Sequence, residues 1–347
     1  MAVNIGADIN ELHIAWYLNG EKWTGGLSNS DKMIYDKRCE ELQKKSMSEY
    51  AARIRQAEVM SDKFMEWANR NGFSGVDKVY WTARSDFKYK NLSGDTSGFV
   101  DDSKDNPTDV LVKFSRHTYS SPYLGLSAKS ILGSLTTEAP VKNPGMKKIE
   151  SFIGVPNAFQ NILTEGVDEA SRLLGVKKSG KYLDKVKMKE ILPEQKGAIS
   201  KKPSKQPIAE SQVTKILSGC RDLLFDKLKT MDDIDVKMYI LDELLDTDKM
   251  PYYVKVTGRS TPNLSSVEAT VDVPRSNKKY RAMVKDNGKM SYEKLGGGDG
   301  YTVGVKCGQT QIIQIRFKFS STRLASGLKM SVAPWPGSIE RGKDATR

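Results

Sequence analysis

A carboxylate and an ammonium group stand near the two ends of a predicted β-hairpin, in the stretch NPTDVLVKFSRHTYSSPYLGLSAKS (106–130). Asp109 begins the first apolar run, Lys129 ends the second, and Ser127 lies two positions before Lys129. Opposite residues of an antiparallel pair have a constant sum of positions. A turn in the middle of the stretch therefore predicts Asp109 opposite the end of the second strand. The two-residue period places Ser127 and Lys129 on one face of that strand.

These residue types suit the hydrolysis of phosphodiester bonds. Asp109 could hold Mg²⁺, which prefers oxygen ligands, and the backbone carbonyl of Ala128 is a further oxygen ligand at the same place. The metal would polarise the phosphate and lower the pKa of a bound water. Lys129 could orient or deprotonate that water and offset charge on the phosphate. The alternative interpretation of the same residues is a structural ion pair on a hairpin surface.

Histidine and cysteine usage excludes several competing chemistries. The chain has two histidines, His13 and His117, so hydrolysis that needs several histidines is disfavoured. The cysteines at 39, 220 and 307 lie far apart in the sequence, which argues against a zinc site and a disulfide framework. A hydrolase with this composition would depend on carboxylates, lysine and a hard cation.

The formal net charge of +12 favours a polyanionic partner, with nucleic acid first and an anionic membrane surface second. The alternative is that the excess lysines only keep the protein in solution. No run approaches the ~18 apolar residues of a membrane-spanning helix. The N-terminal stretch MAVNIGADINELHIAWYLNG lacks the pattern of a signal peptide. We therefore expect a cytoplasmic protein without a membrane partner.

The motif NPTD followed by SAK resembles the Asp…(Asp/Glu)-x-Lys signature, PD-(D/E)XK, of the restriction-endonuclease-like nucleases. Ser127 stands where the second acid usually stands, so the resemblance is to a serine variant. NPTDVLV and LGLSAKS are also similar to phage-type members. The resemblance implies a Mg²⁺- or Mn²⁺-dependent deoxyribonuclease, phage-encoded or of restriction type, that acts on DNA in a bacterial cytoplasm and could be a homodimer.

Serine is a poor metal ligand, so the resemblance also implies a second carboxylate from elsewhere. Serine-variant members supply it from a helix, and Glu11 in the segment INEL is the first choice. Glu138, which follows Lys129 by a short distance in the sequence, is the reserve. The alternative for Glu11 is a solvated helix face.

The elements that must position these residues follow the helix–strand–strand–strand order of that nuclease core. The patterns predict a helix over 7–18 and strands over 76–83, 109–115 and 123–129. The expected fold is α/β, with a restriction-endonuclease-like mixed sheet flanked by helices and a C-terminal antiparallel β-rich region. The expected domains are a nuclease-like core (1–175, with a helical insertion at about 31–72), a basic linker and helical segment (176–249) and a β-rich region (250–347).

Basic side chains outside the hairpin are candidates for contacts with nucleic acid. The stretch 177–205 is rich in lysine, and such side chains can contact phosphates without reading sequence. The alternative is a solvated, mobile linker. The predicted nucleic-acid contacts are Arg84, Lys177, Lys178, Lys181, Lys201 and Lys202.

Two other functions remain open at this point. One is a non-catalytic DNA-binding protein that keeps the nuclease-like fold, which the serine at position 127 permits. The other is a basic structural or virion interaction protein.

Overall fold

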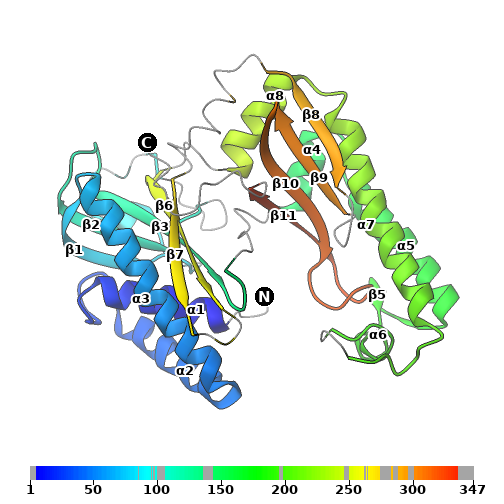
Figure 1. Cartoon of the computed structure of the whole chain (residues 1–347), viewed down its shortest axis with the longest axis horizontal. Coiled ribbons are helices and arrows are strands. Elements are labelled where there is room, and N and C mark those ends of the chain that lie inside the picture. Colours follow the sequence, from blue (N-terminus) through cyan, green and yellow to red (C-terminus); the bar gives the residue numbers. More distant parts are fainter. Residues whose placement is uncertain are drawn as a thin grey trace. The chain divides into compact units, whose positions relative to one another are not determined.

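The structure is a computed structural model of the whole chain. The residues it describes are 5–84, 86–94, 96, 98–99, 106–135, 144–194, 198–245, 250–261, 263, 265–273, 283, 288–295 and 301–334. They fall into two compact units (Figure 1). The first takes its described residues from Met1–Ala139 and Asp246–Arg281, and the second from Pro140–Leu245 and Ala282–Ser338.

A five-stranded mixed sheet, in the order β1-β2-β3-β6-β7, forms the centre of the first unit. Its strands are β1 (Ser74–Trp81), β2 (Val110–Arg116), β3 (Tyr123–Ile131), β6 (Tyr253–Ser260) and β7 (Val267–Asp272). β1, β2 and β3 form an antiparallel meander, β6 runs parallel to β3, and β7 is antiparallel to β6. The predicted mixed sheet with flanking helices is thus present.

Three helices precede or interrupt this sheet in sequence: α1 (Ile5–Leu18), α2 (Asn29–Lys45) and α3 (Met47–Arg70). A short 3-10 helix, η1 (Tyr89–Asn91), follows β1. Ser28 begins α2 with a capping box, because its hydroxyl accepts from the Asp31 N–H and the Asp31 carboxylate accepts from the Ser28 N–H. Ser46 caps α3 by accepting from the Glu49 N–H.

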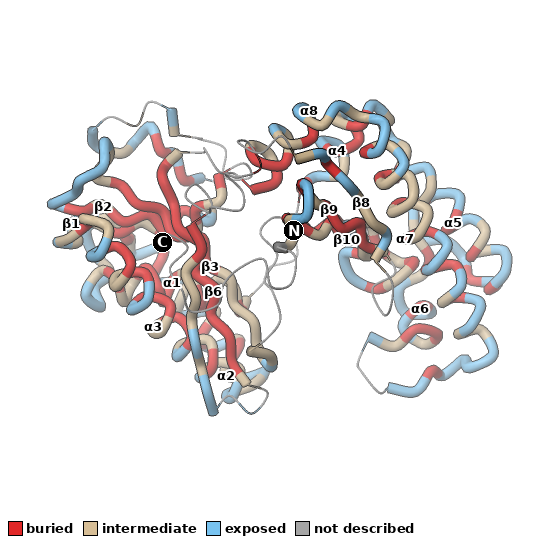
Figure 2. Tube along the Cα trace, turned by 45° about the horizontal axis from the view of Figure 1, so that its top comes forward, coloured by how far each residue is buried: buried red, intermediate tan, exposed pale blue. Residues whose placement is uncertain are grey.

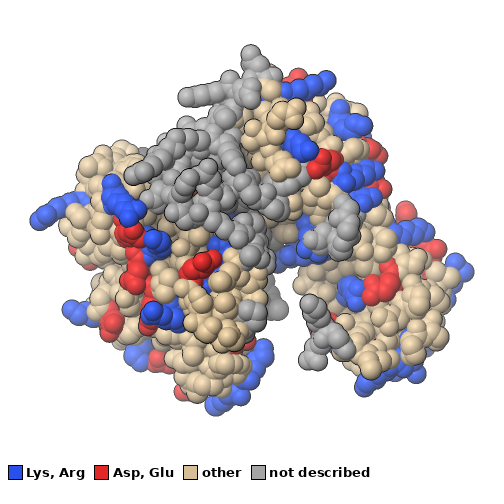
Figure 3. All heavy atoms as spheres, in the orientation of Figure 1, with Lys and Arg blue, Asp and Glu red and all other residues tan. Residues whose placement is uncertain are grey.

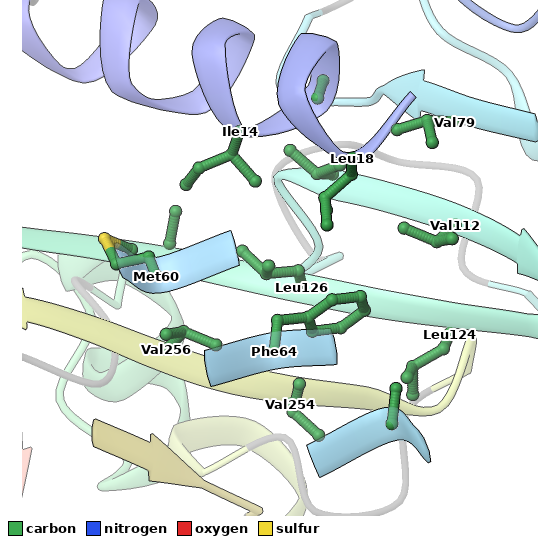
Figure 4. Close-up of a cluster of buried hydrophobic side chains, with 14 of the residues drawn as sticks. Ile14, Leu18, Met60, Phe64, Val79, Val112, Leu124, Leu126, Val254 and Val256 are labelled. Atoms are coloured by element: carbon green, nitrogen blue, oxygen red, sulfur yellow. The ribbon is translucent and has the colours of Figure 1, made fainter. Parts of the chain in front are cut away.

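The helix α3, predicted as part of an insertion, is a core element of the first unit. Met60 and Phe64 of α3 are fully buried against Leu126 of β3 and Val256 of β6 (Figure 4). Ile14 of α1 enters the same cluster. α1 and α3 therefore anchor one face of the sheet, and burial of these large side chains stabilises the unit by about 1.5–3 kcal/mol each.

The second unit contains a four-stranded antiparallel sheet in the order β11-β10-β9-β8. Its strands are β8 (Met290–Leu295), β9 (Thr302–Cys307), β10 (Thr310–Phe319) and β11 (Leu328–Pro334). The helices are α4 (Met146–Phe152), α5 (Ala158–Leu174), α6 (Lys185–Ile191), α7 (Gln206–Leu228), α8 (Asp233–Tyr239) and the π-helical turn η2 (Ile240–Leu244). Strands β4 (Lys178–Ser179) and β5 (Tyr182–Leu183) form a small hairpin.

One face of this second sheet is covered by helices. Phe159 of α5 contacts the ring of Phe317 on β10, with ring centroids 5.1 Å apart, and Ile313 and Ile315 are buried on the same face. Figure 2 shows the buried centres of both units. The predicted C-terminal antiparallel region is therefore present over β8–β11.

The boundaries of the units differ from the predicted domains in two places. β6 and β7, which fall within the predicted C-terminal region, belong to the sheet of the first unit. Over 177–194, the lysine-rich stretch is a packed part of the second unit, because Leu183, Met188 and Ile191 are almost fully buried. Across the described ranges, no helix combines the length and apolar character needed to cross a membrane.

Candidate active site

The hairpin β2–β3 brings Asp109 and Ser127 opposite each other. Val110 pairs with Leu126, and the Asp109 N–H donates to the Leu126 carbonyl at 2.9 Å. The Ala128 N–H donates a 2.7 Å hydrogen bond to Asp109 Oδ2, and the Ser127 hydroxyl lies 3.4 Å from the same oxygen. These bonds hold the carboxylate at the end of the ladder, where β2 begins.

Lys129 completes this cluster. Its Nζ lies 3.5 Å from Asp109 Oδ2, and the side chains of Lys129 and Asp109 are 30% and 19% exposed. Partly buried charges are screened less by salt than surface pairs are. The predicted proximity of Asp109, Ser127 and Lys129 is thus present, and so is the ion pair that the alternative interpretation requires.

The position of Glu11 distinguishes a lone Asp109–Lys129 ion pair from a site with two carboxylates. It is half-buried on α1, and its Oε2 accepts a 3.3 Å hydrogen bond from Trp81 Nε1 at the end of β1. Burial raises the pKa of Glu11 well above its usual value, and the Asp109 carboxylate raises this pKa further, while the Trp81 N–H and Lys129 lower it less. Glu11 therefore lies in the electrostatic field of Asp109 and Lys129, away from the solvated face of its helix.

The apolar residues of α1 explain this placement. Leu12, Ile14 and Ala15 are fully buried, so the helix packs directly against the strands of the sheet. Glu11 precedes Leu12 and sits at the edge of that apolar surface. α1 contacts β1, β2 and β3, which lets a helical carboxylate reach the hairpin end.

The oxygen donors at this place fit a hard divalent cation. The charge of Asp109 raises the pKa of Glu11 because the two carboxylates repel each other. A cation bound by both carboxylates would offset this repulsion. The Ala128 carbonyl faces the same edge of β3 as its N–H, which binds Asp109. Among the described residues, no three His, Cys, Asp or Glu side chains group as metal ligands. Waters would fill the remaining positions, as Mg²⁺ usually requires. The reserve ligand, Glu138, lies outside the described residues.

Sequence reasoning missed a buried lysine beside Ser127. Lys255 of β6 pairs with Ser127 of β3 on one side and with Asp272 of β7 on the other. Lys255 and Asp272 are 3% and 5% exposed. In-register neighbours point to the same face of a sheet, so Lys255 lies beside Ser127 on the face opposite the helices. The segment YVKV, in which Lys255 stands between Val254 and Val256, was the available signal.

Arg84 makes a structural contact. Its Nη1 lies 2.6 Å from Asp31 Oδ1, and Asp31 is 1% exposed because it also belongs to the capping box of α2. Breaking a buried pair leaves an uncompensated charge, at a cost of about 3–5 kcal/mol. This pairing favours a structural role for Arg84 over the predicted phosphate contact.

The five lysines predicted to bind nucleic acid all belong to the second unit, and all are exposed. Lys177 and Lys202 line one pocket of about 480 Å³, together with Lys187, Lys205 and the acids Asp184 and Glu190. Figure 3 shows Lys and Arg side chains over the part of this unit that carries α6.

The other three lysines do not line this pocket. Lys178 forms an ion pair with Asp168. Lys181 and Lys201 are exposed on turns. The structure thus brings together Lys177 and Lys202 from this predicted set.

Comparisons of the chain with protein-family models, with curated proteins and with solved structures found no match.

Proposed function

We propose that this protein is a deoxyribonuclease that hydrolyses DNA phosphodiester bonds with Mg²⁺ or Mn²⁺. The observation that carries the proposal is the cluster at the hairpin end, where Lys129 Nζ lies 3.5 Å from Asp109 Oδ2 and the Ala128 N–H donates to the same oxygen at 2.7 Å, with Glu11 near enough for the charge of Asp109 to raise its pKa. A surface ion pair between Asp109 and Lys129 needs no second carboxylate. Glu11 is a half-buried second carboxylate with a raised pKa, so its ionised form destabilises the metal-free protein.

Each residue has a separate role in this proposal. Asp109, Glu11 and the Ala128 carbonyl would hold the cation. When bound, the cation would polarise the scissile phosphate and lower the pKa of a bound water. Lys129 would orient the attacking water and offset negative charge on the phosphate. Ser127 and the Ala128 N–H would keep the Asp109 carboxylate in place through their hydrogen bonds.

The order of elements supports the same proposal. α1 is followed, after α2 and α3, by the antiparallel meander β1–β2–β3, which is compatible with the helix–strand–strand–strand order expected of a restriction-endonuclease-like core. The net charge of +12 supports a polyanionic substrate, held by salt-dependent contacts to phosphates. A bacterial cytoplasm, as the setting of a phage or restriction enzyme, and a homodimer belong to this proposal.

The test is cleavage of supercoiled plasmid with Mg²⁺ or Mn²⁺. Wild type should nick or cut the plasmid, and Asp109→Asn, Glu11→Gln and Lys129→Met should spare it. The first unit offers a control pair on the same sheet: Lys113 Nζ lies 3.4 Å from Asp77 Oδ2, with a similarly exposed lysine and a more exposed aspartate. Asp77→Asn and Lys113→Met should leave cleavage intact.

A non-catalytic DNA-binding protein is the second candidate, and Ser127 in place of an acid favours it. Intact plasmid with every divalent cation, together with a gel shift of DNA, would support this candidate over the nuclease. No retention of DNA at moderate salt, with a stable oligomer by light scattering, would point to a structural interaction protein.

A further inference from the structure

The sheet face of the second unit that points away from its helices carries cations on adjacent strands. Ile313, Ile315 and Phe317 of β10 are buried against the helices. The alternate residues Arg316 and Lys318 therefore point to the other face. Lys329 of β11 pairs directly with Lys318. We call Arg316, Lys318 and Lys329 the basic sheet face.

The two lysines repel each other across the strands. Like charges directly opposite in an antiparallel pair are destabilising. Burial lowers the pKa of Lys318, and Lys329 and Arg316 lower it further. Within the described ranges, neither Lys318 nor Lys329 has a salt-bridge partner. Glu293, an acid on this face of the sheet, has its Oε2 2.7 Å from Lys306 Nζ and is therefore already paired.

Hydroxyl groups flank the cations in the same row of the sheet. Arg316 pairs with Ser331 of β11 on one side and with Thr302 of β9 on the other. Thr302 is 2% exposed, and its hydroxyl has no hydrogen-bond partner among the described residues. Arginine, lysine and hydroxyl side chains are the groups that contact phosphate oxygens in complexes with DNA.

The spacing of the cations fits a phosphate backbone. Residues two apart on a strand lie about 7 Å from each other. That distance spans about two phosphates of one DNA strand, which recur every ~3.4 Å along the helix axis.

We propose that the basic sheet face binds the sugar–phosphate backbone of nucleic acid, as a contact surface separate from the residues of the hydrolytic site. The inference extends the proposed function, and it rests on that function for the choice of DNA as the nucleic acid. Its contacts carry no sequence information, so this surface adds affinity without specificity.

The experiment uses the full chain and a fluorescent DNA duplex, with Ca²⁺ in place of Mg²⁺ so that binding is separated from cleavage. The variant is Lys318→Gln/Lys329→Gln. The slope of log Kd against log salt should fall by about 1.8, since each phosphate contact contributes about 0.9. The Tm should stay equal or rise, because the cross-strand repulsion is removed.

The matched control removes two lysines from the helix side of the same unit, as Lys215→Gln/Lys227→Gln on α7. An equal loss of slope in the control, an unchanged slope in the Lys318/Lys329 variant, or no DNA binding by wild type overturns the inference. Failure of the nuclease proposal gives a different result. Wild type would leave the plasmid uncut, while the Lys318→Gln/Lys329→Gln variant would still show the reduced salt slope.

Discussion

Glu11 on α1 and Asp109 at the start of β2 interact electrostatically: burial raises the pKa of Glu11, and the charge of Asp109 raises it further. Their elements lie far apart in the sequence, and the packing of α1 on the sheet brings the two groups together. Lys129 alone offsets this negative charge only in part. A bound proton or a bound cation would therefore reduce the repulsion between the two carboxylates.

Binding of a cation should depend on pH through Glu11. A carboxyl group with a raised pKa in the folded state contributes stability at low pH, and this contribution is lost as pH rises from about 4.5, the usual value, through the raised pKa. In EDTA, the Tm of wild type should therefore fall over this range relative to that of Glu11→Gln. Mg²⁺ should raise the Tm of wild type more at pH 8 than at pH 5, by differential scanning fluorimetry. A Mg²⁺ shift independent of pH, or equal in Glu11→Gln, would contradict the site.

Lys129→Met should reduce the rate of plasmid cleavage about 10²–10³-fold, the cost of removing one group that stabilises charge in the transition state. DNA affinity in Ca²⁺ should change little, because one phosphate contact is lost among several. The rate is measured at saturating enzyme, against Lys113→Met as the control. If Lys129→Met cleaves plasmid at the wild-type rate, Lys129 has no role in cleavage beyond its ion pair with Asp109.

Ser127→Asp introduces the acid that the motif usually carries. Because Ser127 Oγ lies 3.4 Å from Asp109 Oδ2, a third carboxylate should lower the Tm in EDTA and increase the stabilisation by Mg²⁺. The double variant Glu11→Gln/Ser127→Asp should regain part of the cleavage lost in Glu11→Gln. If calorimetry shows that the double variant binds Mg²⁺ again but cleavage is not regained, Glu11 does more than bind the cation.

Lys255→Met should destabilise the protein by about 1–3 kcal/mol, because it removes a buried charge beside the buried acid Asp272, its register neighbour on β7. The double variant Lys255→Met/Asp272→Asn should recover much of that loss. Urea unfolding of the four proteins gives the coupling energy. Strictly additive losses would mean that the two charges do not interact across β6 and β7.

His13 should make the protein sensitive to mild acid. Burial lowers its pKa from 6.5 to about 4, and its Nδ1 lies 2.7 Å from the Tyr35 hydroxyl. The unfolded chain binds the proton more tightly, so stability is complete above pH 6.5 and is lost as pH falls toward 4. Between pH 7 and pH 5, unfolding in urea should show a loss of about 2 kcal/mol. His13→Gln should remove this part of the pH dependence, and an unchanged dependence would assign it to other groups.

The sequence predicts the hairpin part of the candidate site because its determinants are local. A short turn and two alternating strands determine which residues face each other, and the register placed Asp109, Ser127 and Lys129 together. Glu11 was expected from the resemblance to serine-variant nucleases, and no local spacing connects it to the hairpin.

The remaining features depend on contacts between segments that are distant in sequence. β6 pairs in parallel with β3 although the second unit's helices lie between them in the chain, so no local pattern predicts Lys255 beside Ser127. The lysine-rich stretch after 176 has the composition of a linker, yet its apolar residues Leu183, Met188 and Ile191 pack into the second unit while its lysines between 177 and 189 stay exposed.

By itself, then, the sequence determined the register of the hairpin, the net charge of the protein and the scarcity of histidine. Only the tertiary structure decided that Glu11 accepts a hydrogen bond from Trp81 within the electrostatic field of Asp109, that α3 is a core element and that Arg84 is paired with Asp31. Side-chain burial and pKa shifts arise from the desolvation and the charges that surround a group in three dimensions. These surroundings are set by packing between segments, which one-dimensional patterns do not contain.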